Sequence, residues 1–85
     1  MTVDDLYVHL LTPREREVLR LMALGYRVKE IETMLDLKHE TARKHWDTVL
    51  SKLQIRRSHV VVVALAAGLV TLAECVEHLP EMVEG

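Results

Sequence analysis

The segment from His39 to Gln54 carries a helical pattern of apolar residues. Successive apolar positions lie four, three, one and three residues apart, at Ala42, Trp46, Val49, Leu50 and Leu53. This spacing puts them on one side of an α-helix. The opposite side carries polar and charged residues: Glu40, Lys44, Asp47, Thr48 and Ser51, flanked by Thr41, Arg43, His45 and Lys52. The pattern predicts a helix over residues 39–54 with one buried and one exposed face.

A second helix is predicted over residues 13–24 by signals at both of its ends. Thr12 and Glu15 form a capping box, in which each side chain accepts a hydrogen bond from the other residue's amide. Pro13 stands at the first helical position, where its missing N–H costs nothing. Val18, Leu19 and Met22 line one face, helped by Leu21, and Gly25 suits the left-handed residue that ends a helix.

A short helix is predicted over residues 28–36, with four apolar side chains turned inward: Val28, Ile31, Met34 and Leu35. Residues 36–38 separate it from the 39–54 helix, which makes the pair a helix-turn-helix. Its cap position, Arg27 or Val28, and the next one, Lys38, are not the Ser, Thr, Asp or Asn that caps usually carry. A helix such as 39–54 fits the DNA major groove, so we interpret it as a recognition helix. By itself it could equally be an amphipathic helix with a solvated charged face.

A fourth helix is predicted after the turn at residues 56–58, with Ser58 as its cap and Gly68 at its end. Four consecutive valines favour a strand, but the alanine-rich stretch over residues 64–67 and the helical context favour a helix. This helix is apolar on all sides, and a domain of this size covers only one of them. A dimer interface is therefore predicted on it, at Val60, Val61, Ala64, Leu65 and Gly68.

Shorter elements are predicted at the two ends of the chain. Residues 1–10 suit a lead-in helix whose apolar side chains, with the next residue, cover one edge of the core: Leu6, Val8, Leu10 and Leu11. Thr71 and Glu74 form a second capping box. It starts a fifth helix over residues 72–79, which Pro80 ends, and the acidic tail 81–85 is expected to fray.

Composition and length favour one all-α domain over residues 1–85, a four- to five-helix bundle. The chain is 49% apolar, with 3 glycines, 2 prolines and no phenylalanine. Its single cysteine, Cys75, excludes an internal disulfide and suits a reducing compartment. The start lacks a signal-peptide pattern, and the apolar run over residues 60–70 is shorter than the roughly 20 residues that a membrane span needs. We therefore expect a soluble, cytoplasmic protein.

Charge is distributed unevenly along the chain. The formal net charge is -2, but residues 38–60 carry six cations against Glu40 and Asp47, a net of +4, whereas residues 71–85 carry -4. Phosphates respond to the local patch more than to the total. The positive charge lies on and just after the proposed recognition helix, which supports nucleic-acid binding there.

Catalytic, cofactor, metal and single-strand binding sites have little support in the sequence. The three glycines are scattered, so there is no phosphate loop, and no serine or cysteine lies in a nucleophile motif; we expect no enzyme and no cofactor. Cys75 and His78 are three residues apart but have no further ligand nearby, so we expect no metal. Trp46 lies on the apolar stripe and is expected in the core, since a platform for single strands would need it exposed.

These residues together resemble the LuxR-type helix-turn-helix domain. The resemblance covers residues 11–70 and rests on the opening Leu-Thr-Pro-Arg-Glu-Arg-Glu-Val-Leu-Arg-Leu over residues 11–21, then on Gly25, Lys29-Glu30-Ile31, Leu35, Thr41, His45, Leu50, Lys52-Leu53 and Gly68-Leu69-Val70. It implies a four-helix DNA-binding domain that dimerises through the fourth helix. Residues 71–85 would be an acidic addition to this core.

The resemblance also implies roles for single residues. Arg43, Lys44 and Asp47 match base-reading positions, and an arginine can pair with guanine through two hydrogen bonds. Thr41 and His45 match positions that face phosphate, and Lys52 matches a lysine that contacts the DNA backbone. With the cations beside them, the predicted DNA-binding residues are Lys29, Lys38, Thr41, Arg43, Lys44, His45, Asp47, Lys52, Arg56 and Arg57.

Several positions depart from the family pattern. Lys38 and Glu40 stand where serine and a small residue are usual, Trp46 replaces a smaller aliphatic residue, and Gln54 replaces glycine or asparagine. Asp47 would repel phosphate unless it accepts from a cytosine amino group. The leading hypothesis is a homodimeric transcription regulator that binds duplex DNA. The alternative is an interaction module of the same fold that binds another regulator or RNA polymerase, through the apolar fourth helix or the acidic C-terminal helix.

Overall fold

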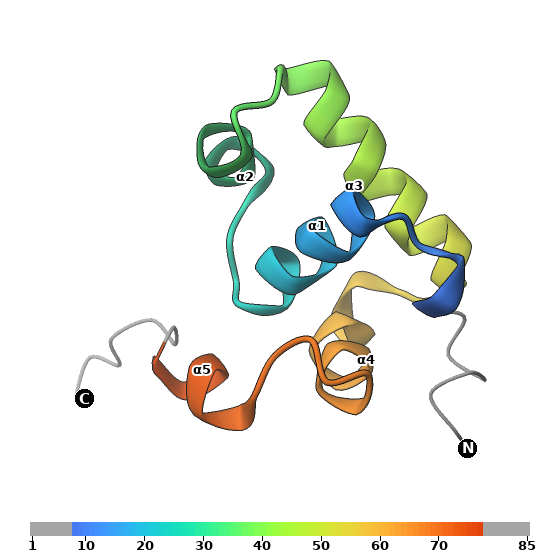
Figure 1. Ribbon diagram of the computed structural model, residues 1–85, viewed down its shortest axis with the longest axis vertical. Coiled ribbons are helices and arrows are strands. Elements are labelled where there is room, and N and C mark those ends of the chain that lie inside the picture. The colour runs from blue at the N-terminus through green and yellow to red at the C-terminus, as the bar shows by residue number, and fades with distance from the viewer. Residues whose placement is uncertain (1–7, 78–85) are drawn as a thin grey trace.

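The computed structural model describes residues 8–77, and every regular element in this range is helical (Figure 1). The all-α prediction is confirmed. Single 3-10 turns cover Val8–Leu10 and Arg57–His59. The five α-helices are α1 (Pro13–Ala23), α2 (Val28–Leu35), α3 (His39–Leu53), α4 (Val60–Ala66) and α5 (Leu72–Glu77).

Helix α1 is the centre of the fold. It packs against α3 on one side and against α4 on another, and α2 packs against α3 (Figure 1). Val18 and Leu19 on α1 are completely buried, and each such side chain contributes about 1.5–3 kcal/mol through burial. They meet buried residues of the other helices and loops in one core: Ile31, Trp46, Val49, Leu53, Val60, Val63, Ala64 and Val70.

The predicted capping box begins α1. The amide of Glu15 donates to Thr12 Oγ1 at 3.1 Å, and the amide of Thr12 donates to Glu15 Oε1 at 2.9 Å. Pro13 is the first helical residue. The two hydrogen bonds satisfy amides that the helix leaves unpaired. The start of α1 is therefore determined locally, as the sequence indicated.

Helices α1 to α4 end in the same way, with a left-handed residue followed by a hydrogen bond that spans six residues. The left-handed residues are Gly25 (φ 98°), Asp36 (φ 53°), Gln54 (φ 55°) and Gly68 (φ 75°). The closing amide-to-carbonyl bonds are Tyr26 to Leu21 (3.1 Å), Leu37 to Glu32 (2.9 Å), Ile55 to Leu50 (3.3 Å) and Leu69 to Ala64 (3.0 Å). This motif satisfies carbonyls at the helix end and turns the chain sharply.

Two of these ends use a residue with a side chain, which is strained in the left-handed region. Replacing Gln54, which is exposed, with glycine should stabilise the domain by about 0.5–1 kcal/mol, because glycine adopts this φ without a Cβ clash. Urea unfolding of Gln54→Gly against the parent measures the gain. The matched control is Ser51→Gly, which is exposed inside α3 and should lose about 0.5–1 kcal/mol. Equal effects at both positions would contradict the argument.

Two predicted core residues are exposed. Met34 was expected to turn inward on α2, but 49% of its surface is accessible, and the buried side chain of this helix is Ile31. Leu10 was expected to cover the core edge and is also 49% accessible, whereas Leu11 is buried. Helix α2 has only about two turns. The part of its surface that is buried is therefore smaller than the set of four inward side chains that the apolar pattern predicted. The other predictions for residues 1–7 lie outside the described residues.

The predicted cap of α4 was wrong. Ser58 lies inside the 3-10 turn, and the residue that caps α4 is His59, whose side chain makes no capping bond. The 3-10 turn runs directly into α4, whose first residue, Val60, is buried. The four valines are helical, as predicted: Val60 and Val63 are buried, and Val61 and Val62 are exposed.

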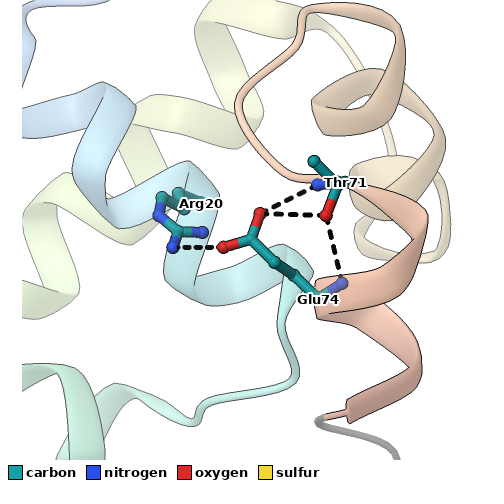
Figure 2. A network of polar contacts seen from close by, with 3 residues as sticks. All are labelled: Arg20, Thr71 and Glu74. Atoms are coloured by element: carbon teal, nitrogen blue, oxygen red, sulfur yellow. Dashed lines mark hydrogen bonds and ion pairs between the residues drawn. The ribbon is translucent and has the colours of Figure 1, made fainter.

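Helix α5 is held to the bundle by a polar contact. The predicted capping box is present, with the Thr71 amide donating to Glu74 Oε1 at 2.9 Å and the Glu74 amide donating to Thr71 Oγ1 at 3.1 Å. The other oxygen of Glu74 accepts from Arg20 Nη2 on α1 at 2.7 Å (Figure 2). None of the residues of α5 is fully buried, so this carboxylate both starts the helix and ties it to α1. The predicted continuation to residue 79 lies outside the described residues.

Candidate nucleic-acid interface

Helix α3 presents one face to solvent along its whole length. Its inward stripe is buried as predicted, at Ala42, Trp46, Val49 and Leu53, with Leu50 partly buried. Helices α1 and α2 pack on α3 (Figure 1). The exposed residues on the outward face are Glu40, Thr41, Arg43, Lys44, Asp47 and Ser51. This is a convex polar ridge, and its shape is suited to a groove more than to a small molecule.

The turn between α2 and α3 sets the direction of that ridge. Asp36 is left-handed, and the chain passes through Leu37 and Lys38 into α3. His39 Nδ1 lies 2.6 Å from Glu32 Oε2, which ties the first turn of α3 to α2. Neither helix start has a side-chain cap, as the sequence predicted, although the amide of Arg27 donates to Glu30 at 2.8 Å. Packing and these local bonds therefore hold the two helices at a fixed angle.

The predicted DNA-binding residues fall into two groups. The first is exposed around the start of α2 and the first three turns of α3, and comprises Lys29, Lys38, Thr41, Arg43, Lys44 and Asp47. The second lies toward the far end of α3 and just beyond it, where His45 and Lys52 are partly buried and Arg56 is exposed. The side chain of Arg57, the tenth predicted residue, lies outside the described part of the structure. The cations with the freest access to a ligand are those of the first group.

Arg43 has a carboxylate beside it. Its Nε lies 3.6 Å from Asp47 Oδ2, one turn further along the helix, and both side chains are more than 60% exposed. An ion pair this open contributes less than about 1 kcal/mol, because water screens it. Phosphate or a base edge can therefore compete for Arg43, and the pair does not neutralise the surface.

Lys52 makes contacts inside the fold. Its Nζ donates to Glu15 Oε1 at 2.8 Å and to the carbonyl of Leu10 at 3.2 Å. The Glu15 side chain is 8% exposed and that of Lys52 is 34% exposed. Burial raises the pKa of Glu15, but the hydrogen bonds from Lys52 and from the Thr12 amide outweigh burial and hold this pKa below its usual value. The sequence predicted the capping role of Glu15 and missed its partner, which lies 37 residues away.

The two capping glutamates predict an acid-sensitive fold. The pKa of Glu74 is also lowered, first by the Thr71 amide and then by Arg20. A lowered folded-state pKa gives stability that is present above the unfolded value near 4.5 and is lost as the pH falls through the folded value. Urea unfolding at pH 7, 5, 4 and 3 should therefore show stability falling below about pH 4.5. The Glu15→Gln variant should lose less stability than the parent as the pH falls from 5 to 3. An equally large loss of stability in this variant would contradict the role given to Glu15.

Arg27 belongs to the same surface, although it was not among the predicted site residues. It is exposed at the start of α2, and with Val28 it lines a surface hollow whose other wall is formed by Arg43 and Trp46 of α3. The available signal was its cap position, where the helix pattern favours a hydroxyl or carboxamide and this chain has a guanidinium. Its nearness to Arg43, however, depends on how α2 packs on α3.

Some residues predicted for the dimer interface are buried within the chain, and others are exposed. Val60 and Ala64 are buried inside the chain itself, against α1. Leu65 is partly buried, and Val61 and Gly68 are exposed. The side chain of Val62, which was not in the predicted set, is 65% exposed. The available apolar surface on α4 is therefore the edge that carries Val61 and Val62.

Comparison with known proteins agrees with this architecture. Residues 9–66 match the family described as "Bacterial regulatory proteins, luxR family". This chain belongs to the LuxR family. The matched range covers α1 to α4, so α5 and its contact with Arg20 lie beyond it.

The LuxR-family chain is similar to two larger regulatory proteins. This chain is 41% identical over 56 residues to the transcriptional regulatory protein DesR of Bacillus subtilis, covering 64% of this chain and 28% of DesR. It is 36% identical over 67 residues to the response regulator protein VraR of Staphylococcus aureus, covering 78% of this chain and 32% of VraR. The chain thus spans about a third of the length of these relatives. No solved structure gives a significant match.

No helix in residues 8–77 has both the length and the apolar character to cross a bilayer. Within the same range, the histidine, cysteine and carboxylate side chains do not gather in any group of three that could hold a metal ion.

Proposed function

We propose that this LuxR-family chain is a transcription regulator that binds duplex DNA with α3 in the major groove. The observation that carries the proposal is the outward face of α3, which is exposed at Glu40, Thr41, Arg43, Lys44, Asp47 and Ser51 while the inward stripe is buried. The major groove admits one α-helix, and a helix held from behind by α1 and α2 presents the side chains that would enter it. Lys44 lies at the middle of this face.

The charge on the surface supports the proposal. Lys29, Lys38 and Lys44 are exposed, and none has a carboxylate within 4 Å among the described residues. Such cations attract phosphates and release counterions from DNA. Thr41 adds an exposed hydroxyl near the start of α3. Lys52, which is bound to Glu15, has a structural role here and is at most a secondary contact.

We further propose that the chain acts as a homodimer, with a second copy seated on the edge of α4 that carries Val61 and Val62. Both side chains are exposed and apolar, and covering them would remove this surface from water. Two copies related by a two-fold axis would place two recognition helices in successive major grooves, about 34–36 Å apart. The predicted target is therefore an inverted repeat with one helical turn between half-site centres.

A selection from a random duplex pool, followed by a salt titration on the selected duplex, tests the proposal. With three to four phosphate contacts per subunit, a plot of log affinity against log salt should have a slope of roughly -5 to -7 for the dimer. Absence of duplex binding at low salt would contradict the proposal. It would favour an interaction module, whose specific support is the pair of carboxylates at Glu40 and Asp47 on the outward face. On α5, Glu74 is engaged by Arg20, and Glu77 is exposed.

A further inference from the structure

We propose that Arg27 and Arg43 together hold one DNA phosphate in the hollow between α2 and α3. Arg43 is then a backbone contact, and Lys44 is the cation of α3 that reads bases. This assignment rests on the proposed function. It differs from the role that the family resemblance implies for Arg43, which is base reading.

The hollow joins two helices that meet only through tertiary packing. Arg27 and Val28 come from the start of α2, and Arg43 and Trp46 come from α3. Its volume is about 360 Å³, many times the roughly 10–15 Å³ that one water needs on this measure, so a phosphate group can enter it. Of its lining residues, Trp46 is buried and Val28 is partly buried, whereas Arg27 and Arg43 are exposed, so the two guanidinium groups supply the charge of the hollow.

The charges around the hollow favour an anion. No carboxylate lies within 4 Å of the guanidinium of Arg27 among residues 8–77, and Arg43 is within 4 Å of Asp47 alone, at Nε. Two guanidinium groups on the walls of one hollow repel each other, and a shared anion removes that repulsion. Arginine and phosphate form short, charge-assisted bonds that are often paired. The backbone amide of Arg27 already donates to the Glu30 carboxylate. The anion is therefore bound by the two arginine side chains and not by this amide at the start of α2.

The position of Arg43 on α3 separates it from Lys44. Lys44 lies at the centre of the outward face, and Arg43 lies on the flank that adjoins α2, where it meets Arg27 across the hollow. When a helix lies in the major groove, its centre faces base edges and its flanks face the phosphate strands. The flank next to α2 is therefore a phosphate position.

Equilibrium binding of Arg27→Ala, Arg43→Ala and Lys44→Ala tests this assignment, on the selected duplex and on single-base variants of it, over a range of salt. Arg27→Ala and Arg43→Ala should each weaken binding to all duplexes by the same factor. Because the other arginine still contacts the shared phosphate, each should lower the salt slope by less than about 1 per subunit. Because the two arginines share one phosphate, the double variant should lose less than the product of the two single losses. Lys44→Ala should instead relax discrimination at one base pair.

Two results would overturn the inference alone: wild-type affinity and slope in Arg27→Ala, or loss of discrimination at one base pair in Arg43→Ala with an unchanged slope. No binding by the parent chain would remove the proposed function and this inference with it. Both arginines are exposed, so the thermal midpoints of the variants should match the parent and show that folding is intact.

Discussion

Replacing Arg43 and Lys44 together with alanine is expected to weaken duplex binding by about 100-fold or more at constant salt. A contact to a base edge contributes about 1–3 kcal/mol, and a hydrogen bond to a charged group such as phosphate contributes about 1.5–3 kcal/mol. Both side chains are exposed, so their loss should leave the free energy of unfolding within about 0.5 kcal/mol of the parent. Fluorescence anisotropy on the selected duplex measures the first effect, and urea unfolding the second.

The matched control is the double alanine variant at Arg14 and Arg16. These arginines are exposed on α1, and their removal lowers the charge by the same two units while leaving α3 intact. A small, salt-dependent loss is expected. If the control lost as much affinity as the α3 variant, affinity would depend on the total charge of the chain, and α3 would not be the DNA-binding element.

Replacing Lys52 with methionine is expected to destabilise the domain by about 2–3 kcal/mol. The change leaves the Glu15 carboxylate buried without its cation, and breaking a fully buried pair costs about 3–5 kcal/mol. The partial exposure of Lys52 reduces that cost. For a domain with about 5–15 kcal/mol of total stability this is a large loss. Urea unfolding at pH 7 measures it.

The companion variant joins Lys52→Met with Glu15→Gln. Glutamine removes the buried charge and still accepts from the Thr12 amide, so the double variant should be more stable than Lys52→Met alone. DNA binding by the folded double variant should stay within about threefold of the parent. Unchanged stability in Lys52→Met together with a large loss of binding would contradict this view. It would assign Lys52 to the DNA backbone, as the family resemblance implies.

The two capping boxes predicted from residues close together in the sequence were confirmed, whereas the predictions for Ser58 and Met34 were wrong. The Thr12–Glu15 and Thr71–Glu74 capping boxes were predictable because each partner lies three residues from the other. The cap predicted at Ser58 was wrong because this residue lies inside the 3-10 turn Arg57–His59, which precedes α4. Met34 was assigned inward by its spacing, but the contact that α2 makes with α3 is too narrow to cover it. The periodicity of apolar residues predicts which side of a helix is buried, whereas the size of the buried area depends on the helix that packs against it.

By itself, the sequence determined the helices, the capped starts of α1 and α5 and the buried stripe of α3, because hydrogen bonds and apolar spacing within a few residues produce them. It also indicated which cations lie on the outward face. Only the tertiary structure decided which charges meet: Lys52 with Glu15, Arg20 with Glu74, and Arg27 across a hollow from Arg43. These partners lie 16 to 54 residues apart in the chain, and the packing angles between helices bring them together.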